Sequence, residues 1–203
     1  MSNVATEMID VVFDLKGEAL PVAYPFALWA ALTRYAPQLA EMQSVGVLPL
    51  RGAIIGDNLI LTKRAKLTIR LPATLAESVT THLNNQQLDL AGCTLHLGAG
   101  KARPIDPYPT IHAHHVTGNN DEVQFVETIN TQLDSMKIKG GVICGKCHTL
   151  KGEQQSIHGY SLVIHDLKPD ASLQLQYAGL GENRQFGCGI FIPYKIITGL
   201  GDD

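Results

Sequence analysis

The chain has 203 residues, of which 45% are hydrophobic and 17% charged, and this balance excludes an extensively disordered protein. The formal net charge of −3 means that any binding of nucleic acid would depend on a local basic stripe rather than on the average charge. No apolar run reaches about 18 residues and no secretory signal is visible, so we expect a cytoplasmic protein with reduced cysteines and no membrane contact.

The first half of the sequence predicts the element order β-α-β-β-α-β. Residues 9–15 are rich in β-branched and aromatic side chains, as strands are, and apolar residues from Phe26 to Ala40 recur with a helical period. The other elements expected here are strands at 45–51, 58–62, 66–71 and 92–98 and a helix from Pro72 to Leu83. Three prolines between residues 101 and 109 then predict a linker.

The second half repeats this order. A helix is expected at 122–136, where apolar residues fall on one face and Asn120 or Asp121 can cap the start. The other elements expected here are strands at 110–117, 142–150, 157–166 and 187–194 and a short helix at 169–177. The sequence therefore predicts an α+β fold of tandem ferredoxin-like (RRM-like) domains, the first at 1–102 and the second at 103–203.

A glycine-rich segment at residues 179–189 lies between the last predicted helix and the last predicted strand. Glycine allows positive φ and close approach of another chain, and successive exposed N–H groups can bind a phosphate. Arg184 in its middle would add a guanidinium group suited to phosphate. The same pattern also fits a helix C-cap, an ordinary loop and a strand bulge, and these alternatives stay open at this point.

With this segment at the end of two such halves, the chain resembles the RAMP superfamily of CRISPR-associated proteins. Within that superfamily it is similar to the repeat-processing endoribonucleases of the Cas-six family, myxan-type subgroup. The resemblance spans nearly the whole chain and is carried by Asp14-Leu15, Leu20-Pro21-Val22, 27–34, 45–52, 67–72, 179–181 and 187–191.

The resemblance implies an enzyme that binds CRISPR repeat RNA and cleaves it without a metal or other cofactor. In that reaction a ribose 2′-OH attacks the adjacent phosphate and leaves a 2′,3′-cyclic phosphate and a 5′-OH. The protein then has to align the nucleophile and stabilise the developing charge. The alternative within the same superfamily is a non-catalytic RNA-binding subunit of a CRISPR effector complex.

The first candidate catalytic residue is Tyr24. Members of this family often carry an acid–base histidine in the loop before the first helix, and residues 20–26 contain none. Tyr24 stands there by position, although an unperturbed tyrosine has a pKa near 10. The alternative is that Tyr24 packs beside Pro25 as an anchor of the loop.

The second candidate is His148, one of eight histidines. It lies on the predicted hairpin near Lys146 and Lys151, and histidine is the natural acid–base group near neutral pH. We expect Tyr24 and His148 to approach the scissile phosphate from opposite domains. Of the other histidines, strand alternation places His112 and His114 on one face and His115 on the opposite face.

The expected contacts with RNA are cations and loop glycines. Residues 62–70 form a basic stripe, although such a stripe is also typical of a solvated strand edge. The predicted RNA-binding residues are Arg51, Lys63, Arg64, Lys146, Lys151, Gly179, Gly181, Arg184, Gly187 and Gly189.

The run Cys144-Gly145-Lys146-Cys147-His148 matches the haem attachment pattern C-x-x-C-H. A zinc site that adds His158 is a second interpretation, and small apolar side chains in a strand are the third and favoured one. A metabolite-binding or redox module is the function that haem or zinc would indicate. We therefore expect no metal.

Overall fold

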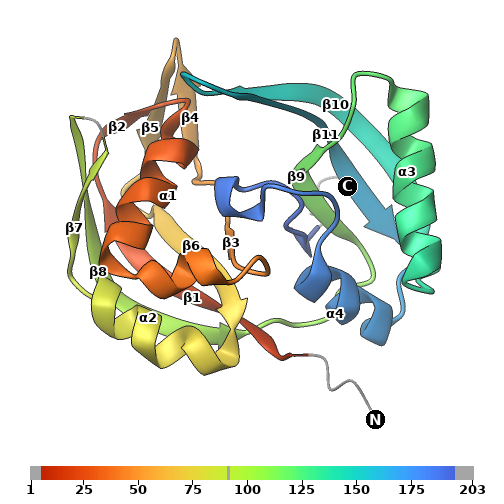
Figure 1. Ribbon diagram of the computed structural model, residues 1–203, viewed down its shortest axis with the longest axis horizontal. Helices are drawn as coiled ribbons and strands as arrows, with labels where there is room; N and C mark the ends of the chain where they lie inside the picture. Colours follow the sequence, from red (N-terminus) through yellow and green to blue (C-terminus); the bar gives the residue numbers. More distant parts are fainter. Residues whose placement is uncertain (1–5, 91, 195–203) are drawn as a thin grey trace, which may run out of the picture.

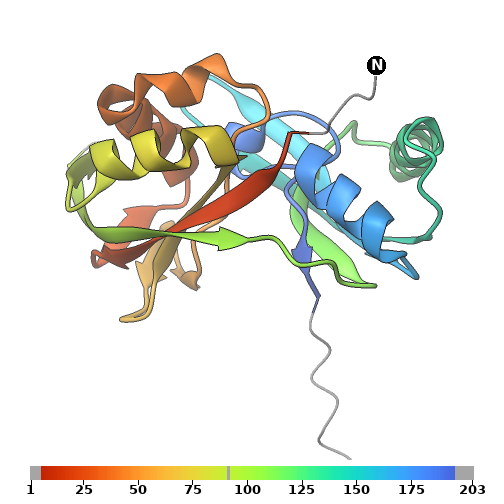
Figure 2. The ribbon, with the colours of Figure 1, turned by 90° about the horizontal axis from the view of Figure 1, so that it is seen from below.

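The structure, a computed structural model, describes residues 6–90 and 92–194. The elements of the N-terminal half are β1 (Met8–Lys16), β2 (Ala19–Pro21), α1 (Tyr24–Tyr35), η1 (Pro37–Glu41), β3 (Gly46–Val47), β4 (Gly52–Ile55), β5 (Asn58–Leu61), β6 (Lys66–Pro72), η2 (Ala73–Leu75), α2 (Ala76–Leu83), β7 (Gln87–Leu90) and β8 (Cys93–Pro104). Five of these strands form an antiparallel sheet in the order β3-β6-β1-β8-β7. Both α-helices cover one face of this sheet (Figure 1, Figure 2).

Strand alternation builds the core of the N-terminal half. Phe13 of β1 and Ile69 of β6 are fully buried beneath the helices. Leu28 and Leu32 of α1 and Val79 of α2 belong to the same cluster, because the helical period places apolar residues on the inner face. The alternate residues of β1 and β6 therefore point away from the helices, toward the open face of the sheet.

A small second sheet combines β2, which precedes α1, with β4 and β5, which lie between α1 and β6 in the chain. Its strands run antiparallel in the order β2-β5-β4, and a tight turn at Gly56, with φ +61°, joins β4 to β5. Figure 2 shows the β4–β5 hairpin, in brown and orange, projecting from the side of the molecule opposite α1 and α2. The hairpin thus stands clear of the helical layer.

The C-terminal half has the same layered build. Its elements are β9 (Ile111–Thr117), α3 (Glu122–Ser135), β10 (Gly141–Lys151), β11 (Ser156–His165), α4 (Pro169–Ala178), η3 (Arg184–Phe186) and β12 (Ile192–Pro193). The antiparallel sheet has the order β10-β11-β9-β12. The carboxylate of Asp121 caps α3 by accepting from the N–H of Gln124, and Phe125 stacks on Tyr160 with centroids 4.6 Å apart.

Corresponding strands have the same order in the two halves. If each sheet is listed starting from the last strand of its β-α-β-β-α-β half, the N-terminal order is β8-β1-β6-β3 and the C-terminal order is β12-β9-β11-β10. The mixed α+β class is therefore confirmed. No helix within residues 6–90 and 92–194 is long and apolar enough to cross a membrane.

Arg70 joins the two halves. Its guanidinium pairs with Asp10 through two contacts of 2.8 and 3.0 Å and donates to the backbone carbonyls of Gln176 and Phe191 at 3.1 and 2.6 Å. Only 1% of the side chain is exposed. A buried charge needs a partner and filled hydrogen bonds, and Arg70 obtains these only when the C-terminal half is docked.

Several predicted bounds differ from the structure. The strand expected at 45–51 has only two residues, Gly46 and Val47, because Pro49 lies just beyond and lacks a donor. The strand expected at 187–194 is reduced to Ile192–Pro193, since Gly187 and Gly189 adopt positive φ. β8 pairs with β1 as far as Pro104, so the strand expected at 92–98 extends into the stretch predicted to be a linker.

Candidate nucleic-acid interface

The glycine-rich segment 179–189 is folded onto the protein itself. The N–H of Gly179 donates to Leu175, and the N–H of Gly189 donates to His115 at 2.7 Å. The N–H of Gly187 donates to a carbonyl within the segment, and that of Gly181 donates to a side-chain amide oxygen on α3 at 3.4 Å. All four glycine amides are thus already hydrogen-bonded. The expectation that they cradle a phosphate has no free donors to support it.

The segment needs glycine for steric reasons. Gly179, Gly181, Gly187 and Gly189 have φ of +69°, +70°, +91° and +66°. A Cβ on Gly189 would lie 2.0 Å from the carbonyl oxygen of Leu180. Gly179 is the C-cap of α4, so the helix-cap interpretation of that glycine is the correct one.

Arg184 lies inside the protein rather than on its surface. Only 6% of it is exposed, and its Nη1 donates to the carbonyl of Ala178 at 2.5 Å. Its Nε and Nη2 are buried without a partner among the described residues. Burial is the main reason that the pKa of this guanidinium is lowered to about 10. A role as a surface ligand for phosphate does not fit this position.

Tyr24 is buried at the start of α1. Its hydroxyl accepts a hydrogen bond of 2.8 Å from the backbone N–H of Leu50. Burial raises the pKa of Tyr24 to about 12, which makes the hydroxyl a poor base and a weak acid near neutral pH. The structure therefore favours the anchor interpretation over the catalytic one.

A basic cleft of about 520 Å³ lies between the open faces of the two sheets. Its floor includes Val12 on β1 and Ile192 on β12, which belong to different halves. Its charged lining residues are Arg51, Arg64, Lys66 and Arg103, and His114 joins them. Of the predicted RNA-binding residues, the cleft brings together Arg51 and Arg64. Lys63 is exposed beside Arg64 but does not line it.

Two cations of this cleft were missed from the sequence. Arg103 lies in the stretch whose prolines predicted a linker, although its alternation with the preceding strand residues could have indicated β8. Lys66 belongs to the basic stripe and makes an ion pair with Asp14. That pair lowers the pKa of the Asp14 carboxyl through the hydrogen bond and charge of Lys66.

Four histidines lie on the open face of the C-terminal sheet, next to the cleft. The rings of His112 and His114 are 4.9 Å apart, and those of His115 and His148 are 6.5 Å apart. A Cβ on Gly159 would lie 2.7 Å from His115 Nε2, so this glycine makes room for the ring. His148 pairs with Gly159 across the β10–β11 ladder.

The face of His115 differs from the prediction. The register of β11 with β9 shifts between Tyr160 and Leu162, so β9 carries a bulge there. The bulge turns His115 to the open face, beside Gly159 and His148, rather than toward the helices. Strand alternation predicts opposite faces only for a regular strand.

Burial is the main cause that lowers the pKa of His112, His114 and His115. The positive charge of Arg51 also lowers the pKa of His112 and of His114, and His148 does the same for His114 and His115. These imidazoles are therefore mostly neutral near pH 7 and can accept a proton. The Nε2 of His115 has no hydrogen-bond partner among the described residues.

The β10–β11 hairpin carries Lys146 and Lys151 away from this cleft. Both side chains are exposed, and the backbone N–H of Lys146 donates to Ser161 Oγ at 3.0 Å. The hairpin turn, residues 152–155, packs near the start of α1, where Phe26 approaches Gly152. The hairpin therefore reaches across to the N-terminal half.

The C-x-x-C-H run lies on β10. Cys144 is half-buried and Cys147 is exposed, and the register with β11 shifts between them. Within the described part of the chain, no three His, Cys, Asp or Glu side chains are grouped as metal ligands would be. The run is therefore a bulged strand segment in this fold.

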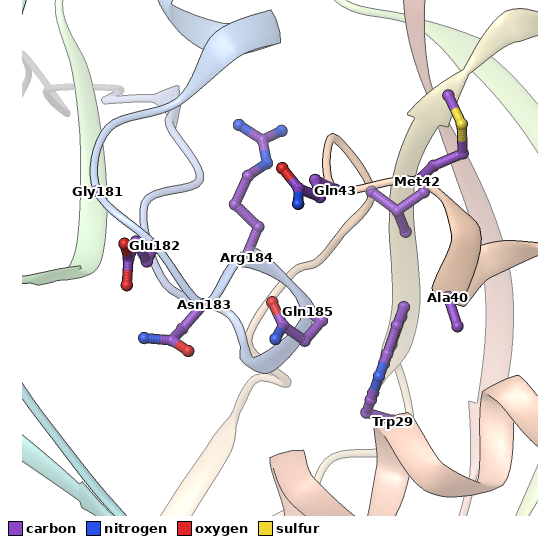
Figure 3. Close-up of a pocket in the computed structure, with 10 residues that line it drawn as sticks. Trp29, Ala40, Met42, Gln43, Gly181, Glu182, Asn183, Arg184 and Gln185 are labelled. Atoms are coloured by element: carbon purple, nitrogen blue, oxygen red, sulfur yellow. The ribbon is translucent and has the colours of Figure 1, made fainter.

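A second pocket, of about 450 Å³, lies between the glycine-rich segment and α1. Figure 3 shows that its lining comes from two sides, with Trp29 and Gln43 on one side and the backbone of residues 181–185 on the other. Phe186, next to this wall, packs on Phe26 with centroids 4.7 Å apart. The glycine-rich segment therefore forms one wall of this pocket, and it packs against the N-terminal half through Phe186.

Comparison with known proteins identifies the family. The family model described as Cas6 Crispr matches residues 9–196. A CRISPR-associated endonuclease Cas6 of Myxococcus xanthus (strain DK1622) is 30% identical over 189 residues, which cover 91% of this chain and 81% of that protein. This agrees with the resemblance seen in the sequence.

Solved structures show the same fold at low identity. A CRISPR associated protein Cas6 has a TM-score of 0.67 at 10% identity, over 93% of this chain and 100% of that one. Thermus thermophilus Cse3, bound to an RNA representing a pre-cleavage complex, has a TM-score of 0.54 at 12% identity, over 92% and 98%. Since the family model covers most of the chain, this protein belongs to the Cas6 family of CRISPR-associated proteins.

Proposed function

We propose that this protein is an endoribonuclease that binds CRISPR repeat RNA and cleaves it without a metal ion. The observation that supports this function best is the basic cleft with a histidine-rich sheet face beside it. The Cas6 endonuclease that shares 30% identity adds support from its name. The proposal treats each half as a ferredoxin-like domain, with the division after β8.

The cleft suits a single-stranded or looped RNA backbone. Arg51, Arg64 and Arg103 offer charge to phosphates, and the apolar floor offers surface to bases. Lys66 is held by Asp14 and contributes less. Lys63, Lys146 and Lys151 remain proposed contacts for RNA that extends beyond the cleft, because all three are exposed.

Proton transfer is assigned to the histidines. A neutral imidazole, His115 or His114, accepts the proton of the ribose 2′-OH while the O2′–P bond forms. A second, protonated imidazole gives a proton to the departing 5′ oxygen as the P–O5′ bond breaks. His148 keeps the catalytic role predicted for it, since it is exposed and its ring centroid lies 6.5 Å from that of His115. The buried hydroxyl of Tyr24 takes no part in this scheme.

The test is single-turnover cleavage of labelled repeat RNA in EDTA, with analysis of the product ends. We expect a 2′,3′-cyclic phosphate and a 5′-OH. His115→Ala and His148→Ala should each slow cleavage by about 10²-fold or more, as expected for loss of general acid–base catalysis. His82→Ala, on the exposed side of α2, is the matched control and should cleave normally. Cleavage that requires Mg²⁺, or full rates in both variants, would contradict the scheme.

The second candidate function is a non-catalytic RNA-binding subunit of a CRISPR effector complex. Two observations favour it: residues 20–26 lack a histidine, and the hydroxyl of Tyr24 is engaged by Leu50. The same assay distinguishes the two functions. A gel shift without any cleavage product identifies the binding subunit.

A further inference from the structure

Two large apolar side chains stand exposed at the end of the β4–β5 hairpin. Ile54 is 71% exposed and Ile55 is 66% exposed, and the other two residues of β4 are exposed as well. β4 is also an edge strand of its sheet. Burying such side chains is favourable, so leaving two of them in water favours a bound partner.

The hairpin holds these side chains on a firm support. β4 and β5 pair over their whole length, and the carbonyl of Asp57 in the turn accepts from the N–H of Val22 at 3.0 Å. At the base, a Cβ on Gly52 would lie 2.3 Å from the carbonyl oxygen of Ile60, so the strands approach closely there. The tip is therefore presented in a fixed position rather than on a loose loop.

The two isoleucines point to opposite faces of the hairpin, because successive side chains on a strand alternate. Ile54 is on the same face as its partner Leu59, and Ile55 is on the other face with Asn58. A patch for docking a protein would collect its apolar atoms on one face. Apolar atoms on both faces of a thin projection instead suit insertion between two flat surfaces, such as neighbouring bases.

The base of the hairpin is positively charged. Arg51 directly precedes β4, and Lys63 and Arg64 follow β5, and all three side chains are exposed. Arg51 and Arg64 also line the basic cleft, so the hairpin rises from the rim of that cleft. A second copy of the chain would meet like charges here, whereas a polyanion would meet opposite ones.

We infer that the β4–β5 hairpin is an RNA wedge, in which Ile54 and Ile55 insert at a base step while Arg51 and Arg64 hold the neighbouring phosphates. The inference rests on the proposed function, since it places RNA in the cleft. The apolar tip carries a carboxylate, Asp57, and so favours bases over phosphates. Inserting a side chain between two bases costs the least stacking energy where an RNA stem meets a single strand. The wedge would therefore select that junction.

The experiment compares the wild-type protein with the double variant Ile54→Ser/Ile55→Ser. Repeat RNA carries 2-aminopurine on one or the other side of the stem junction, where loss of stacking raises its fluorescence. The wild type should raise the signal at one of these positions, and the double variant should not. Its affinity should fall by about tenfold or more, while the slope of affinity against salt stays unchanged, because no phosphate contact is lost.

Val123→Ser is the matched control, since Val123 is 68% exposed on α3 in the other half. It should match the wild type in affinity and in fluorescence. A double variant that also matches the wild type, while both bind RNA, overturns the wedge and leaves the proposed function standing. A wild-type protein that binds no repeat RNA overturns both.

A photo-crosslinking amino acid in place of Ile54 identifies the partner directly. Crosslinks to repeat RNA at the junction support the wedge. Crosslinks to a second copy of the chain, or to another protein in the presence of saturating RNA, overturn it.

Discussion

Tyr24 contributes to the stability of the fold through a single buried hydrogen bond. Its hydroxyl is the acceptor for the N–H of Leu50 in a buried setting, and phenylalanine would leave that N–H without a partner. Tyr24→Phe should therefore lower the free energy of unfolding by about 1–3 kcal/mol, as measured by urea denaturation. The single-turnover cleavage rate should not change. A large loss of rate with unchanged stability would restore the catalytic role first predicted for this residue.

The histidines predict how stability depends on pH. The pKa values of His114 and His115 are lowered in the folded protein, whereas an unfolded histidine has a pKa near 6.5. Below that value the unfolded chain binds more protons, so stability should fall as the pH falls, until the folded histidines are protonated too. Urea denaturation at pH 7.5, 6.5 and 5.5 measures this. His115→Gln should flatten the decline, and an equally steep decline would show that other groups cause it.

The sequence could predict some site residues but not their environment. Arg51 and Arg64 were found because cations near a strand suggest phosphate binding, and the cleft contains both. Arg184 has the same chemistry, yet it lies beneath the backbone of its own loop. The local sequence does not distinguish an exposed arginine from a buried one that donates a hydrogen bond to a backbone carbonyl. The side chain of His115 was misplaced for another reason, a bulge in β9.

At the scale of elements, the steric fit of the glycine-rich segment can be tested by comparing a glycine in it with a glycine in an open turn. Gly189 and Gly56 have similar φ, +66° and +61°, but a Cβ at Gly189 meets the carbonyl of Leu180 whereas nothing lies within 4 Å at Gly56. Gly56→Ala should cost about 1–2 kcal/mol for the left-handed backbone alone. Gly189→Ala should cost clearly more. Equal losses of stability in thermal unfolding would show that the segment can shift to accept a side chain.

Elements with a strong period were predictable, and those set by distant contacts were not. α3, the β10–β11 hairpin and α4 lie close to their predicted bounds, because each has a clear apolar period or a polar turn. Residues 48–51 read as a strand by composition. In the fold, the N–H of Leu50 bonds to the hydroxyl of Tyr24 instead of a neighbouring strand. Such a contact spans 26 positions and leaves no local signal.

At the scale of the whole molecule, Arg70 couples the two halves. Arg70→Met removes the partner of Asp10 and leaves the carbonyls of Gln176 and Phe191 without their donor. We expect a loss of about 3–5 kcal/mol in the free energy of unfolding, the usual cost of breaking a buried ion pair from one side. Cleavage should decline as well, because both halves line the cleft.

The control for this variant is Arg34→Met, which removes an exposed arginine at the end of α1 and should change stability little. Adding Asp10→Leu to Arg70→Met should recover part of the lost stability, since no unpaired carboxylate would then remain. No recovery in the double variant would mean that the lost carbonyl contacts, rather than the ion pair, dominate the effect.

The glycine amides of residues 179–189, all bonded within the protein, bear on how this family evolves. Selection for a correctly assembled fold is enough to retain these glycines, even in a descendant that has lost the ability to cut RNA. The segment should therefore persist in inactive relatives, while the histidines of the open sheet face are free to drift in them. A genome survey that searches for the glycine pattern collects proteins with this architecture. Whether such a protein is an active nuclease would then be judged from whether it has histidine at positions 114, 115 and 148.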